Sequence, residues 1–184
     1  MTGADAAALD RLLLARSVRR GHFVLASGRT SEFYVDARLT TMSAEGLILI
    51  GRLGLVALRE AGWAPASVGG LTMGADPVAY AIAAASVASP PILDAFSVRK
   101  EAKAHGTGRR VEGNFRAGDP IVVVEDVITS GGSALKAIAA IQEEGGQVLG
   151  VLAVVDREEG GRAVLEAAGH EVVALTTAIR LGVK

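Results

Sequence analysis

Runs of branched apolar residues alternate along this chain with segments whose apolar residues recur at helical spacing. The apolar runs predict strands at residues 67–71, 90–98, 120–126, 147–156 and 170–177. The segments between them predict helices at residues 76–88, 133–145 and 161–169. Because the central strands are apolar throughout rather than at alternate positions, both of their faces must be covered. The pattern therefore predicts an α/β fold with a parallel, Rossmann-like sheet flanked by helices.

The N-terminal part of the chain has a different pattern. Residues 4–20 predict an amphipathic helix, and the segment after them predicts a hairpin that turns at Ser27 and Gly28. A further helix should begin after Ser43, whose hydroxyl suits an N-cap, and end near Gly62.

These elements suit a single domain, residues 1–184, because 184 residues is an ordinary domain length. Residues 1–40 do not follow the strand and helix repeat, so we expect them to form a small N-terminal cap, or hood. Residues 41–184 are predicted to be the α/β core. Within the core, residues 99–113 have almost no apolar side chains, which predicts an exposed, mobile loop.

Composition and charge narrow the classes of function. The formal net charge of -1 gives no electrostatic reason to expect a nucleic-acid partner. The chain has no cysteine, which excludes disulfides and thiolate chemistry. No apolar run is long enough to span a membrane, and the N-terminus lacks the pattern of a signal peptide. We therefore expect a cytoplasmic protein with no membrane partner.

The most informative segment is IVVVEDVITSGGSALKAI, residues 121–138, in which a buried strand leads through a small polar loop into a helix. Glycines allow backbone amides to converge on an anion, and the start of the helix adds further amides and a favourable dipole. The hydroxyls of Thr129, Ser130 and Ser133 can donate further hydrogen bonds. The loop therefore predicts a phosphate site at the carboxyl edge of the sheet.

Two acids, Glu125 and Asp126, stand directly before this loop. Carboxylates repel a phosphate but accept hydrogen bonds from ribose hydroxyls, and a hydrated Mg²⁺ bridged by the ligand would reduce the repulsion. The segment thus predicts a ribose-5-phosphate site. The plainer alternative is a strand, a polar turn and a capped helix. A dinucleotide site is disfavoured because no G-x-G-x-x-G follows a strand.

The loop SVRKEAKAHGTGRRVEG carries a dense set of cations. They are Arg99, Lys100, Lys103, His105, Arg109 and Arg110. A charge run is often only a solvated loop. This one follows a strand end on the side of the phosphate site, which favours a lid that brings positive charge to a polyphosphate and excludes water.

Residues 121–138 resemble the phosphoribosyl diphosphate (PRPP) binding motif of type I phosphoribosyltransferases. The segment RKEAKAHG, together with LASGRTSEFYVDAR and DREEGG, resembles the orotate phosphoribosyltransferase family over residues 20–160. The resemblance implies the type I fold with its hood. It also implies transfer of the phosphoribosyl group of PRPP to orotate in UMP biosynthesis. It further implies a Mg²⁺ cofactor held mainly through PRPP and water, and a homodimer whose loop, residues 99–113, reaches the neighbouring site.

The resemblance also assigns individual residues. The catalytic residues would be Lys103, His105 and Asp126, with Lys103 as the principal lysine of the loop and His105 as a donor to the diphosphate. The PRPP-binding residues would be Arg99, Lys100, Lys103, His105, Glu125, Asp126, Val127, Ile128, Thr129, Ser130, Gly131, Gly132 and Ser133. The orotate-binding residues would be Phe33, Tyr34, Thr129 and Arg157. A guanidinium such as that of Arg157 can pair bidentately with the orotate carboxylate.

The sequence departs from the family pattern at Ala26 and Met73, where many members have a lysine. Both differences remove a cation that could contact PRPP. Two alternatives stay open at this point. One is a type I phosphoribosyltransferase for another base. The other is a PRPP-sensing regulator that binds nucleic acid, which the near-neutral chain and short N-terminal cap disfavour.

Overall fold

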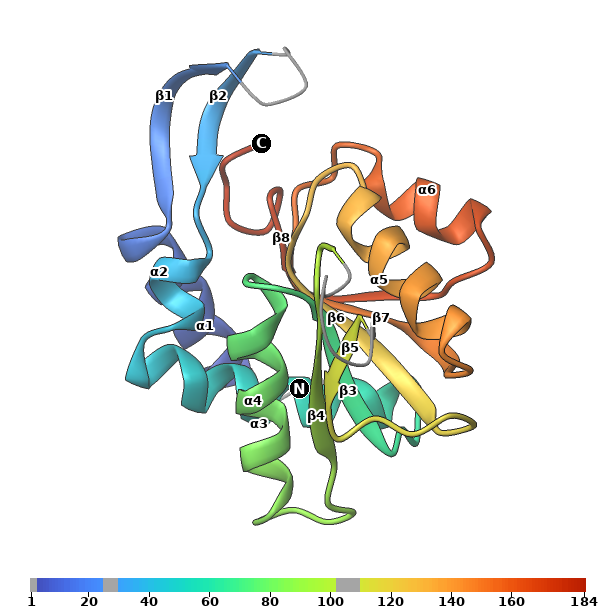
Figure 1. The fold of residues 1–184 in the computed structure, drawn as a ribbon. Helices are drawn as coiled ribbons and strands as arrows, with labels where there is room; N and C mark the ends of the chain where they lie inside the picture. The colour runs from blue at the N-terminus through green and yellow to red at the C-terminus, as the bar shows by residue number, and fades with distance from the viewer. Residues whose placement is uncertain (1–2, 25–29, 102–109) are drawn as a thin grey trace.

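The computed structural model describes residues 3–24, 30–101 and 110–184. Within this part of the chain, six strands form the main sheet in the order β5-β4-β3-β6-β7-β8. Five of them are parallel, whereas β5 at the edge pairs antiparallel with β4. Their bounds are β3 Ser67–Leu71, β4 Asp94–Val98, β5 Val111–Gly113, β6 Pro120–Ile128, β7 Gln147–Asp156 and β8 Val172–Thr177. The predicted parallel sheet is confirmed (Figure 1).

Helices cover both faces of this sheet (Figure 1). The helices α3 and α4 lie on one face, and α5 and α6 lie on the other. Their bounds are α3 Ala44–Glu60, α4 Ala75–Ser86, α5 Gly132–Glu143 and α6 Gly161–Ala167. Along β6, Val122 and Val124 belong to the core beneath α3 and α4, whereas Ile121 and Val123 belong to the core beneath α5. This two-sided burial is why residues 121–124 of the strand are all apolar.

The N-terminal elements stand beside the main sheet. They are α1 Gly3–Arg16, the paired antiparallel strands β1 Val18–Val24 and β2 Thr30–Val35, and the short helix α2 Arg38–Thr41. The hairpin is confirmed, while its predicted turn at Ser27 and Gly28 lies outside the described residues. The helix α1 packs against α3. The division of the chain at residue 40 stays a prediction.

The predicted helix over residues 4–20 is wrong at its C-terminal end. The amide of Ser17 donates to the carbonyl of Leu13 at 2.8 Å, which closes the last turn, and Val18 already pairs with Val35 in the hairpin. The Ser17 hydroxyl is buried and hydrogen-bonded to the hydroxyl of Thr40 at 2.7 Å. The helical spacing of apolar residues does not show where this helix ends, because strand pairing and a buried hydrogen bond set its C-terminal end.

Other boundaries differ for local reasons. The N-cap at Ser43 is confirmed, since its side chain accepts from the amide of Gly46 at 3.1 Å. The strand predicted at 90–98 begins only at Asp94, because Pro90 and Pro91 have no amide hydrogen for a ladder. The strand β5 falls inside the predicted loop 99–113. Its three residues are too few to carry an alternating pattern. None of the described helices is long and apolar enough to cross a membrane.

Candidate active site

The candidate site lies at the carboxyl edge of the parallel strands, between the hairpin side of the molecule and α5. An open cavity of about 510 Å³ occupies this edge. Its lining residues are Tyr34, Val35, Asp36, Ala37, Arg38, Leu71, Thr72, Met73, Gly74, Lys100, Glu125, Asp126, Val127, Thr129, Ser130, Ser133 and Arg157. Segments far apart in the sequence therefore meet here, as expected for ligand sites of open α/β sheets.

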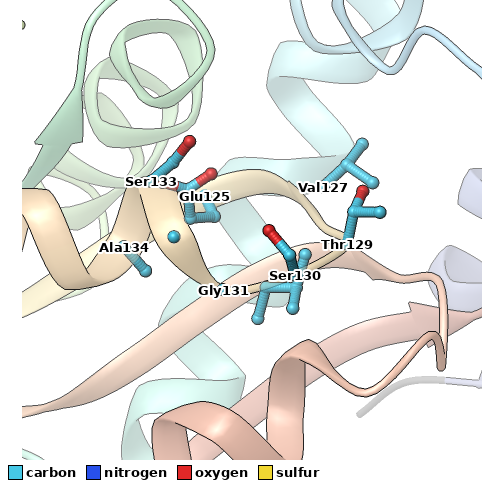
Figure 2. Close-up of a pocket in the computed structure, with 9 residues that line it drawn as sticks. Glu125, Val127, Thr129, Ser130, Gly131, Ser133 and Ala134 are labelled. Carbon is cyan, nitrogen blue, oxygen red and sulfur yellow. The ribbon is translucent and has the colours of Figure 1, made fainter. Parts of the chain in front are cut away.

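The loop between β6 and α5 forms a smaller hollow of about 90 Å³ beside this cavity (Figure 2). Its lining residues are Glu125, Val127, Ile128, Thr129, Ser130, Gly131, Gly132, Ser133 and Ala134. Gly131 adopts a left-handed conformation, with φ of 79°, which glycine alone adopts without strain. No described side chain caps the start of α5. The first amides of this helix are thus left for a ligand, and a phosphate suits them by charge and size.

The phosphate loop packs backbone to backbone against the turn that begins α6. A Cβ on Gly161 would lie 2.6 Å from the carbonyl oxygen of Thr129 and 2.8 Å from the amide nitrogen of Gly131. Only glycine permits this approach. The DREEGG segment therefore supports the phosphate loop through its last glycine, although the two segments are about thirty residues apart.

The two adjacent acids point to different sides of β6, because side chains alternate along a strand. Glu125 lies beneath the phosphate loop, close to Ser133 and Ala134, and is only 6% exposed (Figure 2). Asp126 lies on the side of the β3–α4 turn, where a Cβ on Gly74 would come within 2.6 Å of its Oδ1 atom. Both residues still line the larger cavity. Whether both bind a ribose stays a prediction.

Burial, with a smaller contribution from the charge of Asp126, raises the pKa of Glu125 to about 8. Its Oε1 atom is buried and has no hydrogen-bond partner among the described residues. A carboxyl group in such a place is more stable with its proton than without it. The raised pKa favours the protonated form of Glu125 near neutral pH, and this form repels a phosphate less than a carboxylate does.

We expect Glu125 to make the ligand-free protein less stable as the pH rises. Its folded-state pKa lies above the ordinary value of 4.5, so the folded protein binds more protons and the free energy of unfolding falls between pH 4.5 and about 8. Glu125→Gln should remove this component and raise stability at pH 8 by roughly a few kcal/mol, with little change at pH 4.5. Urea unfolding at several pH values measures the difference.

The matched control for this prediction is Glu143→Gln, which changes an exposed acid on α5. It should leave the pH dependence as in the wild type. Parallel pH profiles for Glu125→Gln and the wild type would show that Glu125 carries its charge in the folded protein at neutral pH.

Several features act on the pKa of Asp126 in opposite directions, and the pKa is raised overall. Burial raises its pKa, and a hydrogen bond from its own neighbour, the amide of Val127 at 2.9 Å, opposes that effect. The positive charge of Arg38 also favours the ionised form. Asp126 is thus an accessible acceptor at the cavity wall, well placed for a hydroxyl or a hydrated cation.

Asp36 and Arg38 were not among the residues predicted for the site, yet both line the cavity. Their side chains form a bidentate ion pair, with 2.8 Å from Nε to Oδ1 and 3.0 Å from a terminal nitrogen to Oδ2. The hydrogen bond from Arg38 is the largest cause of the lowered pKa of Asp36. The segment FYVDAR contains both residues, and its acid and its base two positions apart are the sequence signal for this pair.

Arg157 directly follows β7 and lines the larger cavity, and its backbone amide donates to the carbonyl of Ile128, just before the phosphate loop, at 3.0 Å. Its guanidinium lies over the ring of Phe33, 4.7 Å from the ring centre, and pairs with Glu159 at 2.6 Å. Ser31 accepts a longer bond at 3.3 Å, while the buried Nε has no partner among the described residues. The structure thus brings together Phe33 and Arg157, two of the residues predicted to bind orotate. A ligand carboxylate would share the guanidinium of Arg157 with Glu159, a residue that the sequence did not predict for the site.

The basic loop is described only at its two ends. Lys100 lines the cavity, and the amide of Arg99 donates to the carbonyl of Arg110 at 2.8 Å, so the ends lie side by side. The Arg99 side chain pairs with Glu112 at 3.1 Å. Lys103 and His105 lie outside the described residues, as does Ala26. Met73 lines the cavity and is 59% exposed.

The chain is similar over most of its length to known proteins, although one comparison found no match. No protein-family model matches the chain. Orotate phosphoribosyltransferase of Rhodopirellula baltica is 44% identical over 177 residues, which are 94% of this chain and 92% of that protein. The enzyme of the same name from Mycobacterium bovis is 48% identical over 171 residues, 92% of each chain.

Solved structures give the same result. The crystal structure of Mycobacterium tuberculosis orotate phosphoribosyltransferase with inorganic phosphate has a TM-score of 0.84 and 40% identity, covering 98% of this chain and 99% of that one. The same protein with PRPP has a TM-score of 0.81 and 41% identity, with coverage of 97% and 99%. The fold is that of a type I phosphoribosyltransferase. Its sequence identity to these relatives shows that the chain belongs to the orotate phosphoribosyltransferase family.

Proposed function

We propose that this protein transfers the phosphoribosyl group of PRPP to orotate, giving orotidine 5-phosphate and diphosphate, as a step of UMP biosynthesis. The observation that carries the proposal is that two features adjoin one cavity. The phosphate-sized hollow at the start of α5 shares Glu125, Thr129, Ser130 and Ser133 with the cavity, and Tyr34 and Arg157 also line it, with the Arg157 guanidinium over the ring of Phe33. A phosphorylated sugar in the hollow and an anionic base beside Arg157 would fit this arrangement.

The proposed residue roles rest on the family resemblance, and for the described residues also on this arrangement. The loop residues 127–133 would hold the 5-phosphate, and Glu125 and Asp126 would bind the ribose hydroxyls. Phe33, Tyr34, Thr129 and Arg157 would hold orotate. Arg99, Lys100, Lys103 and His105 would contact the diphosphate. The bond from orotate N1 to ribose C1 forms as the bond from C1 to the diphosphate oxygen breaks, and cations near that oxygen would stabilise its developing charge.

Mg²⁺ is the proposed cofactor, held mainly through PRPP and water. Among the described residues no group of three or more acidic or histidine side chains is arranged to hold a metal ion. Asp126 offers one acceptor at the cavity wall for a water of the hydrated ion, which suits the preference of Mg²⁺ to keep several waters. When bound, the ion would supply positive charge to the diphosphate leaving group.

We further propose a homodimer in which residues 99–113 of one subunit reach the site of the other. The family resemblance supports this proposal. The cytoplasmic location expected from the sequence stays a prediction.

Loss of orotate absorbance tests the function directly. Wild-type protein, PRPP and Mg²⁺ should consume orotate, while uracil and hypoxanthine in parallel reactions should persist, and omission of Mg²⁺ should stop the reaction. Turnover of another base instead of orotate would overturn the substrate. No turnover of any base, with PRPP still bound in calorimetry, would favour a PRPP-sensing regulator.

A further inference from the structure

The return end of the basic loop is held by a side chain from the far end of α5. The carboxylate of Glu144 accepts two consecutive backbone amides through its Oε1 atom, from Arg110 at 2.9 Å and from Val111 at 3.0 Å. Val111 begins β5, the edge strand of the sheet. Edge amides lack a neighbouring strand, so a carboxylate is a suitable acceptor for them.

A second set of contacts connects Arg110 to a residue of the cavity wall. The Arg110 guanidinium reaches the carbonyl oxygens of Arg99 and Lys100, each at 3.4 Å. The amide of Arg99 donates back to the carbonyl of Arg110 at 2.8 Å. Lys100 itself lines the ligand cavity. A continuous path of contacts therefore runs from Glu144 through Arg110 to a cation at the wall of the cavity.

The helix α5 holds Glu144, the first residue of this path, in a fixed position. Its N-terminus forms the phosphate hollow, and Glu144 follows its last residue, with its amide bonded to the carbonyl of Ala140 at 3.3 Å. Its inner face is buried in the core through residues such as Ala137 and Ile141. One rigid element thus bears the phosphate loop at one end and the anchor of the basic loop at the other.

We propose that Glu144 is a positioning residue for this reaction: by holding Arg110 and Val111, it fixes Lys100 at the distance from the phosphate loop that PRPP requires. This inference rests on the proposed function, because it assumes that PRPP occupies the cavity. Glu144 lines neither the cavity nor the phosphate hollow. Its acceptor oxygen matters more than its charge, since both bonds go to backbone amides.

Three variants separate positioning from mere stability. Glu144→Ala removes the acceptor, Glu144→Gln keeps an acceptor oxygen without the charge, and Glu143→Ala removes an exposed acid one residue away as the matched control. We expect Glu144→Ala to lower kcat/KM for PRPP about tenfold, because displacement of a binding group by an ångström has effects of this size or larger. The KM for orotate should change less than twofold, and the other two variants should resemble the wild type.

Hydrogen exchange gives a readout that does not depend on activity. In Glu144→Ala the amides of Arg110 and Val111 should exchange faster than in the wild type, and in Glu144→Gln they should remain protected. If wild-type protein neither binds nor turns over PRPP, the proposed function fails and this inference fails with it. If the wild type is active and Glu144→Ala matches Glu143→Ala in kcat/KM for PRPP, the positioning role is overturned while the function stands.

Discussion

Replacing Arg157 with alanine is expected to raise the KM for orotate by about 10²-fold and to leave the KM for PRPP nearly unchanged. Charge-assisted hydrogen bonds from a guanidinium to a carboxylate contribute about 1.5–3 kcal/mol, which corresponds to this range. Arg157 is fixed for the task by the ring of Phe33 and by Glu159. Initial rates at varied orotate and saturating PRPP measure the effect.

Two comparisons make the Arg157 test specific. Arg157→Lys keeps the positive charge but loses the planar fork, so it should recover only part of the orotate affinity. Arg116→Ala changes an exposed arginine away from the cavity and should behave as the wild type. Because Arg157→Ala also removes a buried ion pair with Glu159, thermal unfolding must be measured alongside. A folded Arg157→Ala protein with unaltered orotate dependence would exclude the carboxylate contact.

Replacing Lys103 with alanine should lower kcat by about 10²-fold or more, with a much smaller change in PRPP affinity. A cation beside the departing diphosphate stabilises charge that develops mainly in the transition state, and loss of such a group typically costs 10²–10³ in kcat. Lys103 lies outside the described residues, but Lys100 and Arg110 on either side place the ends of its segment at the cavity. Single-turnover kinetics with calorimetry of PRPP binding would separate the two effects.

Lys136→Ala is the matched control, since Lys136 is an exposed lysine on α5 that lines neither hollow. It should retain full activity. Mixing Lys103→Ala with Arg157→Ala protein should restore activity if the loop of one subunit acts in the site of the other, because one site of each mixed dimer is then intact. Full activity of Lys103→Ala alone would remove this lysine from the mechanism.

The phosphate loop shows what local sequence can predict. Residues 121–138 indicated a buried strand, two acids and a glycine loop before a helix, and these elements follow in the predicted order, although β6 continues two residues past the acids to Ile128. Local chemistry was sufficient to predict an anion site because the glycines, the hydroxyls and the helix start are adjacent in sequence, whereas the packing of Gly161 against the loop appears only in the structure. The same reasoning treated Glu125 and Asp126 as one pair. Alternation along β6 separates the two side chains, but the raised pKa of Glu125 depends on its burial, which only the tertiary structure shows.

The order of apolar and polar residues by itself determined the α/β class, the parallel sheet and the position of the phosphate loop, since these follow from periodicity and backbone chemistry. Only the tertiary structure decided that Glu159 shares the guanidinium of Arg157, that Asp36 and Arg38 enter the cavity wall, and that Glu144 holds the return of the basic loop. Arg157 and Glu159, like Asp36 and Arg38, are two residues apart, but nothing in these segments shows that Arg157, Asp36 and Arg38 line one cavity. Glu144 and Arg110 are 34 residues apart in sequence. The cavity residues meet because parallel strands bring their carboxyl ends to one edge, where side chains from distant segments share a single space.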